Sequence, residues 1–222
     1  MKKLLVVAVL FLGTVALFGQ NKIKDEKVFE IKSGMIEYQV EGMSKGTKTF
    51  WFDDYGRIQC TRTITTVKVM GFSSTEDKLE IRTKEWVYNI DMKEKTGTKM
   101  KTDAAMSPID NTYSGLTDAE KKQFVEGVEQ SMKIKDAGTG EVLGRSCNIK
   151  EVGDGNKMWL YKNITLKSEV GSGMIKVNET ATKFEENKAI PASQFQPPAG
   201  IEIEDKTEEM KKMMEGFNLN EE

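Results

Sequence analysis

The chain has 222 residues, with 33 basic residues against 35 acidic ones, two cysteines and no histidine. Without histidine it cannot hold a Ser-His-Asp triad, a Cys-His pair or a His-ligated zinc or haem, and two cysteines are too few for a four-thiolate zinc site or an iron-sulfur cluster. We therefore expect no cofactor, no metal site and no catalytic residues, and we do not expect an enzyme.

The first 20 residues have the pattern of a secretory signal peptide. Lys2 and Lys3 precede an apolar run over residues 4–12, which residues 13–14 interrupt before a second apolar run over 15–18. The run is too short for a typical transmembrane helix, although an uncleaved anchor is the alternative. No cysteine lies near the junction, so a lipidated N-terminus is not encoded. We expect a soluble protein exported to the periplasm of a bacterium, or secreted.

Short segments of alternating polarity follow the signal peptide. In residues 34–42, Ile36, Tyr38 and Val40 share one face, and polar side chains occupy the other. Further strands, separated by turns rich in Asp and Gly, are expected at 47–52, 57–68, from Leu79 onward, 86–92, 142–152, 158–162, 164–170 and 174–184. Alternation bounded by such turns is typical of hairpins, and the sequence therefore predicts an antiparallel meander with one face exposed to water.

One segment in the middle of the chain has the pattern of a helix. Thr117 is an N-cap candidate with Glu120 three residues later, which is the capping-box spacing. Apolar side chains then recur at helical spacing, at positions 124, 125, 128 and 132. We expect a helix from Asp118 to about Lys133.

The C-terminal end of the chain is acidic and rich in methionine. Residues 202–222 hold eight acids and three lysines, so residues 21–201 are nearly neutral and carry no basic stripe for nucleic acid. We expect one domain over residues 21–205 and a tail over residues 206–222. Apolar positions at helical spacing in this tail allow either a frayed or disordered end or a docked amphipathic helix; they are Met210, Met213, Met214 and Phe217.

Three segments, residues 142–147, 158–167 and 195–201, resemble motifs of an uncharacterised family of exported bacterial proteins. Residues 34–38 and 85–91 also resemble strands of that family, so the resemblance spans most of residues 30–203. The family itself resembles the lipoprotein-localisation carriers of the LolA/LolB superfamily. This chain departs from the pattern at Arg145, where an aromatic residue is usual, and at Thr165, where proline is common.

The resemblance implies a mainly β fold with minor α structure. The expected architecture is a curved antiparallel sheet, or incomplete β-barrel, with one or two helices packed across its concave face. In the carriers this sheet surrounds an apolar cavity, and we expect the lining to include inward aromatic and methionine residues. The candidates are Tyr38, Phe50, Phe52, Trp86, Tyr88, Met92, Trp159 and Tyr161. Ordinary core packing is the alternative interpretation of each of them.

Cys60 and Cys147 are the candidates for a disulfide, because exported proteins meet oxidising conditions. Such a bridge would close a loop of about 90 residues and contribute about 4–5 kcal/mol on the chain-entropy model. Two buried thiols on separate strands are the alternative.

Two functions fit these features. The first is a non-enzymatic periplasmic binding protein that holds a lipid or a lipoprotein acyl chain in the half-barrel. The alternative is a structural or protein-interaction module of the cell envelope with a filled core, which binds a protein through a sheet edge or the acidic tail.

Overall fold

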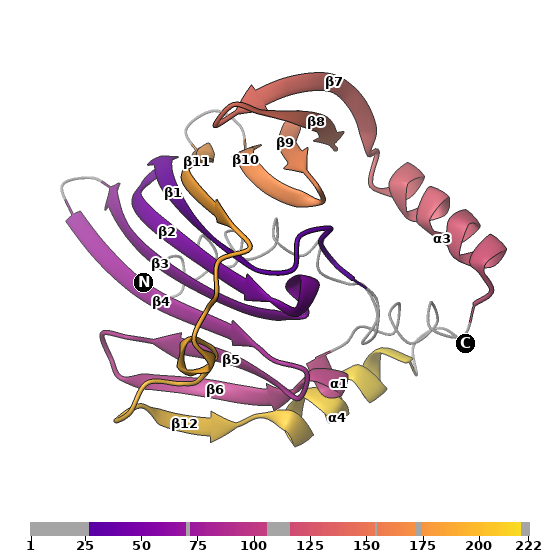
Figure 1. Ribbon diagram of the computed structural model, residues 1–222. Helices are drawn as coiled ribbons and strands as arrows, with labels where there is room; N and C mark the ends of the chain where they lie inside the picture. The colour runs from indigo at the N-terminus through magenta and orange to yellow at the C-terminus, as the bar shows by residue number, and fades with distance from the viewer. Residues whose placement is uncertain (1–26, 70–71, 106–115, 154, 172–174, 219–222) are drawn as a thin grey trace.

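The computed structural model describes residues 27–69, 72–105, 116–153, 155–171 and 175–218 (Figure 1). The predicted signal peptide lies outside the described residues. Within them the protein is mainly β, with one large curved sheet of twelve strands. The first six strands are β1 (Gly34–Gly42), β2 (Ser44–Asp53), β3 (Ile58–Val69), β4 (Phe72–Arg82), β5 (Trp86–Asp91) and β6 (Thr96–Lys101).

After α1 (Thr102–Ala105) and α3 (Asp118–Ser131), the chain forms a second set of strands. These are β7 (Lys135–Val142), β8 (Arg145–Val152), β9 (Asn156–Tyr161), β10 (Ile164–Val170) and β11 (Val177–Glu186). The last elements in the described part of the chain are β12 (Glu202–Asp205) and α4 (Thr207–Asn218). Two short 3-10 helices, η2 (Asp54–Gly56) and η4 (Ala192–Phe195), lie between strands.

The order of strands across the sheet is β12-β6-β5-β4-β3-β2-β1-β11-β10-β9-β8-β7. The two meanders, β1–β6 and β7–β11, meet where β1 pairs with β11, and these pairings are antiparallel as the sequence predicts. β12 pairs with β6 in parallel. The strands β6, β7 and β12 were not predicted, because glycine and charged residues interrupt the alternation of polarity in β6 and β7 and because β12 is short and acidic.

The described residues of the sheet form two apolar clusters, on opposite faces. Ile36 of β1 and Phe50 of β2 are paired neighbours, and they define what we call the inner face; their cluster also includes Val142 of β7. Five strands separate β2 from β7 in the sheet, so the sheet must curl over the inner face to bring these residues into one cluster. The opposite, outer face carries a second cluster around Cys60 and Ile81, which are also paired neighbours.

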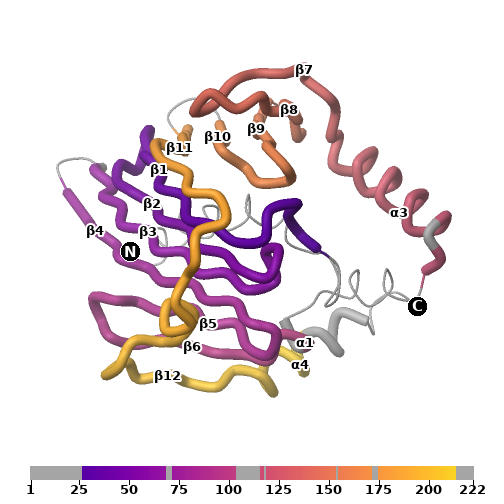
Figure 2. Tube along the Cα trace, viewed as in Figure 1, coloured from indigo at the N-terminus to yellow at the C-terminus, as the bar shows by residue number. Residues whose placement is uncertain are grey.

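The segment between β11 and β12 covers the second cluster. In Figure 2 residues 187–201 run as an orange tube from β11 past the strands β3 to β5 to reach β12. Phe195 of η4 is 8% exposed and belongs to the cluster, and partly buried Ile190 and Ile201 pack against it. This covering segment explains how β3, β4 and β5 can bury apolar residues on the outer face.

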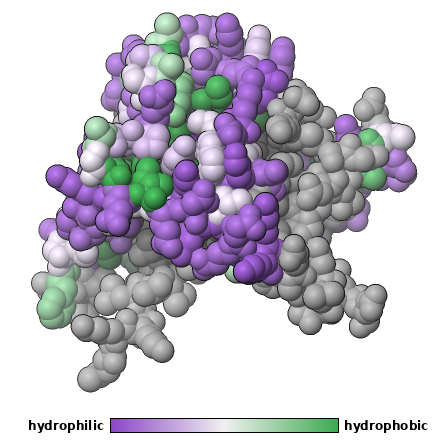
Figure 3. Space-filling model, turned by 90° about the horizontal axis from the view of Figure 1, so that it is seen from below, coloured by the Kyte–Doolittle hydropathy of each residue, from purple (hydrophilic) through white to green (hydrophobic). Residues whose placement is uncertain are grey.

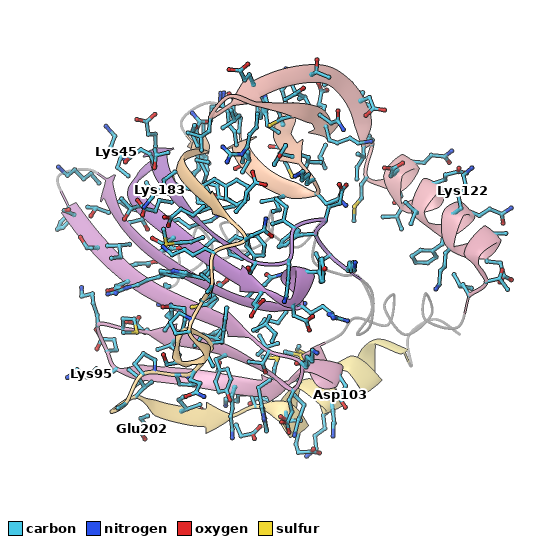
Figure 4. All side chains as sticks on the ribbon, viewed as in Figure 1. Lys45, Lys95, Asp103, Lys122, Lys183 and Glu202 are labelled. Carbon is cyan, nitrogen blue, oxygen red and sulfur yellow. The ribbon has the colours of Figure 1, made fainter. Side chains whose placement is uncertain are left out.

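Helix α3 confirms the predicted helix at Asp118. The Thr117 hydroxyl accepts from the Glu120 backbone N–H at 3.4 Å, and the Thr117 N–H donates to the Glu120 carboxylate at 2.8 Å, which completes the predicted capping box. The expected packing of helices across the concave face is not found for the described helices. Figure 1 shows α3 standing beside the sheet, and none of its described side chains is buried. Lys122, labelled in Figure 4, projects from the helix away from the sheet.

The acidic C-terminal segment is attached to the sheet edge. The Lys101 N–H donates to the Thr207 hydroxyl at 3.1 Å, and Thr207 is 7% exposed.

The surface seen from below in Figure 3, on the side of β12 and β6, is mostly hydrophilic with small separate groups of hydrophobic side chains. Of the helices in the described ranges, none has the length and hydrophobicity that crossing a membrane requires.

Candidate functional site

The structure divides the eight candidate lining residues between the two faces. Five of them belong to or pack against the inner cluster, namely Tyr38, Phe50, Phe52, Trp159 and Tyr161. The other three do not. Tyr88 and Met92 pack against the outer cluster, and Trp86 lies two residues before Tyr88 on the same side of β5, with ring centroids 6.5 Å apart. The expectation that all eight line one site is therefore wrong for Trp86, Tyr88 and Met92.

The inner face is filled by residues 27–33, which precede β1 and which we call the N-terminal strap. Three strap side chains, Val28, Phe29 and Ile31, are 4–5% exposed and belong to the inner cluster. The Phe29 ring lies 5.1 Å from the ring of Phe52 and 6.0 Å from that of Phe50, with edge-to-face geometry. Val28, Phe29 and Ile31 were not predicted from the sequence as core residues, although three apolar residues in a charged stretch could have indicated a buried segment.

Backbone hydrogen bonds hold the strap against the turn that contains Tyr55. The N–H groups of Val28 and Phe29 donate to the Tyr55 carbonyl at 3.0 and 2.9 Å, and the Tyr55 N–H donates to the Lys32 carbonyl at 2.8 Å. Gly56 in the same turn has φ +82°, and a Cβ there would lie 2.4 Å from the Phe29 ring. Glycine is therefore required at this position both by the backbone conformation and by the close approach of Phe29.

Next to the aromatic rings, the inner face carries a partly buried ion pair. The Lys48 ammonium pairs with the Glu179 carboxylate, and these side chains are 19% and 15% exposed. The same ammonium lies 4.8 Å from the centre of the Tyr38 ring. The Tyr38 hydroxyl donates to the Thr165 carbonyl at 2.8 Å. Burial, and secondly the charge of Glu179, raises the pKa of Tyr38, so this hydroxyl stays protonated.

The neighbouring strands β3 to β5 present polar side chains on the inner face. Glu80 lies on this face because its paired neighbour is Thr61, which in turn pairs with Phe50. Partial desolvation raises the pKa of the Glu80 carboxyl, and Glu179 acts in the same direction against the opposing charges of Lys48 and Arg82. The side chain nevertheless remains exposed, so water reaches it from one side. Charged and apolar surfaces thus adjoin on the inner face.

Arg145 closes the rim of the inner cluster. From β8 its Nε donates to the Glu186 carboxylate of β11 at 2.9 Å, although β9 and β10 lie between those strands in the sheet. Its guanidinium lies 4.8 Å from the centre of the Phe184 ring and 5.8 Å from that of Tyr161. The residue that departs from the resembled motif therefore covers aromatic rings and ties distant strands together.

The two cysteines are free buried thiols, and the favoured disulfide is not formed. Cys147 belongs to the inner cluster and Cys60 to the outer cluster, where the Gln194 amide donates to its sulfur at 3.5 Å. The strands β2, β1, β11, β10 and β9 lie between β3 and β8, which carry them. Desolvation by burial raises the pKa of each thiol, so neither is an activated nucleophile. The alternative of two buried thiols on separate strands describes the structure.

In the part of the chain that the structure describes, no three His, Cys, Asp or Glu side chains are grouped so that they could hold a metal ion.

Comparisons with known proteins support the fold. No protein-family model and no curated protein matches the chain. The structure is similar to the crystal structure of an uncharacterized conserved protein from Thermus thermophilus, with a TM-score of 0.50, 9% identity, and coverage of 79% of this chain and 91% of that one. At this identity the likeness supports the mainly β fold with its curved sheet and nothing further.

Two structures of PNGF-II are more distant. Their TM-scores are 0.39 and 0.37, at 15% and 12% identity. Each match covers 82% of this chain but only 32% or 33% of PNGF-II, so this chain spans about a third of that protein.

Proposed function

We propose that this protein is a non-enzymatic exported binding protein that holds an apolar ligand, a lipid or a lipoprotein acyl chain, on the inner face of its curved sheet. The ligand would contact Tyr38, Phe50 and Phe52, with Trp159 and Tyr161 at the margin. One observation carries the proposal. The aromatic surface of the inner face is covered by the N-terminal strap, a separate piece of chain whose apolar side chains occupy the place that a ligand would take.

Exchange of the strap for a ligand is energetically feasible. Three buried strap side chains, at about 1.5–3 kcal/mol each, contribute roughly 5–9 kcal/mol to holding the strap in place. An acyl chain of about 15 methylene groups gains about 12 kcal/mol on full burial, at about 0.8 kcal/mol per group. An acyl chain could therefore compete with the strap for the inner face.

The experiment is native mass spectrometry of the mature protein with a C16 lysophospholipid, combined with hydrogen exchange of the strap. We expect a one-to-one complex and faster exchange of the Val28 and Phe29 amides when the ligand is bound, because their bonds to the Tyr55 carbonyl are released. A Phe29→Ser variant should bind more tightly, whereas Phe72→Ser, at a residue 83% exposed, should bind as the natural protein does. Absence of any complex with the natural protein and with Phe29→Ser would contradict the proposal.

A second candidate is a structural or protein-interaction module of the cell envelope. It is favoured by the close packing of Phe29 on Phe52 and Phe50, which leaves the inner cluster filled by the chain itself. In that case lysophospholipid would not bind, and capture of an envelope protein would be lost on deleting residues 206–222, which include α4.

A further inference from the structure

We propose that the ligand's headgroup is zwitterionic and that it sits on a charged cluster of the inner face formed by Lys48, Glu80, Arg82 and Glu179. This proposal rests on the proposed function, because it assigns the polar end of the same amphiphile. It specifies the chemical class of the headgroup, which the aromatic surface of the inner face does not determine by itself.

The pairing of the strands places these side chains together and next to the aromatic rings. Lys48 is the paired neighbour of Tyr38, and Glu179 is the paired neighbour of Val40 two residues further along β1. Tyr38 connects the two surfaces, because its ring belongs to the inner cluster while the Lys48 ammonium lies 4.8 Å above that ring. A ligand whose chain lies against Tyr38 therefore has its polar end beside Lys48 and Glu179.

The charges of this surface alternate in sign. Lys48 pairs with Glu179, and Glu80 lies under the combined influence of Lys48, Arg82 and Glu179. At its border, Lys78 and Asp91 form a further pair at 2.6 Å, so positive and negative groups are balanced. A headgroup with one charge meets an opposing charge beside each favourable one, whereas a headgroup with a phosphate and an ammonium can pair with both.

The Lys48–Glu179 pair is poorly explained by stability alone. Side chains that are 15–19% exposed have lost most of their hydration, and in such a setting the desolvation cost often equals or exceeds the attraction between the charges. Apolar residues at these two positions would extend the neighbouring aromatic cluster at no such cost. A role in recognising a polar ligand accounts for the pair.

The test compares three amphiphiles with the same C16 chain by competitive native mass spectrometry. They are lysophosphatidylethanolamine, which is zwitterionic and whose ammonium can donate to a carboxylate, lysophosphatidylglycerol, which is anionic, and monopalmitoylglycerol, which is uncharged. We expect the natural protein to prefer the zwitterion by roughly tenfold, since charge-assisted hydrogen bonds typically contribute that much discrimination.

Two double variants test whether the preference for the zwitterion depends on the Lys48–Glu179 pair. Lys48→Met with Glu179→Gln should reduce it to within about twofold by removing the charge-assisted bonds, while binding of monopalmitoylglycerol is retained. The matched control is Lys183→Met with Glu37→Gln, a pair at 3.8 Å between β11 and the neighbouring strand β1 that is exposed and on the outer face, and it should keep the preference.

Equal binding of the three amphiphiles by the natural protein, or an unchanged preference in the Lys48 and Glu179 variant, would overturn the headgroup assignment while leaving the proposed function intact. Failure of all three amphiphiles to bind either the natural protein or the Phe29→Ser variant would overturn both proposals.

Discussion

The two parts of the sheet bury their apolar residues on opposite faces. In β1, β2, β8, β10 and β11 the buried apolar side chains of the inner cluster lie on the inner face, whereas in β3, β4 and β5 those of the second cluster lie on the outer face under η4. The change of side occurs at β2, where Phe50 and Phe52 face inward and Trp51 faces outward. Three consecutive aromatic residues thus let one strand belong to both clusters.

The two clusters also differ in how completely they are buried. Among the described residues, the inner cluster has thirteen that are buried, with Trp159 and Tyr161 partly buried beside it. In the same part of the chain the outer cluster has five buried residues and seven partly buried ones. We infer that the inner cluster contributes most of the stability, and that the outer cluster mainly attaches the segment of residues 187–201.

The largest effect is expected for Phe52→Ala in the inner cluster. Phe52 is 0% exposed and contacts rings of the strap and of β11, so its removal leaves a cavity that costs about 4 kcal/mol. Urea unfolding measures this loss. A loss below about 1 kcal/mol, as at typical surface positions, would break the distinction between the two clusters.

A smaller and more local effect is expected for Phe195→Ala in the outer cluster. Phe195 is 8% exposed, and its loss should cost about 3 kcal/mol or less, because the segment that it anchors can relax. Hydrogen exchange should accelerate in residues 187–201 and in β3, while β1 remains protected. Equal acceleration in β1 would mean that the two clusters are one cooperative core.

A third variant, Thr117→Ala, concerns the connection between the two meanders. Loss of this N-cap should destabilise α3 by about 1 kcal/mol, typical of N-cap removal. Global urea unfolding should not change, because none of the described side chains of α3 is buried. Helical circular dichroism and amide exchange at Glu120 would report the local effect, and a lowered global stability would show that α3 supports the sheet.

The smallest effect is expected for Glu80→Gln on the polar part of the inner face. Because the pKa of Glu80 is raised above 4.5 in the folded protein, the folded state binds this proton more tightly and loses stability as the pH rises through that range. The variant should therefore be slightly more stable than the natural protein near pH 7 and equal to it near pH 3.

Glu85→Gln is the control, because its effect on the stability of the folded protein near pH 7 should have the opposite sign. A hydrogen bond from Lys101 lowers the pKa of Glu85, so this carboxylate supports the folded state above its ordinary pKa and loses that contribution in acid. Urea midpoints measured across pH for both variants should shift in opposite directions near neutrality. A shift of the same sign for both would contradict the electrostatic description of the inner face.

Local features of the chain were predictable where local forces decide them. The strand at residues 34–42 follows from its alternation, and the helix after Thr117 follows from its capping box, since these depend on neighbours within four residues. The strap and β12 were not predictable in this way. Phe29 is placed by a turn at Tyr55 and Gly56, and β12 is placed by an edge strand about 100 residues earlier in the chain.

The composition alone excluded histidine as a catalytic or metal-binding residue. The alternation of polarity along the chain determined that most strands have one apolar and one polar face. Which face points inward was decided by the tertiary structure alone. The register of a strand with its neighbours decides which of its side chains face inward, and a shift of one residue moves every side chain to the opposite face. For this reason Trp86 and Phe50, which look alike in the sequence, lie on opposite faces of the sheet.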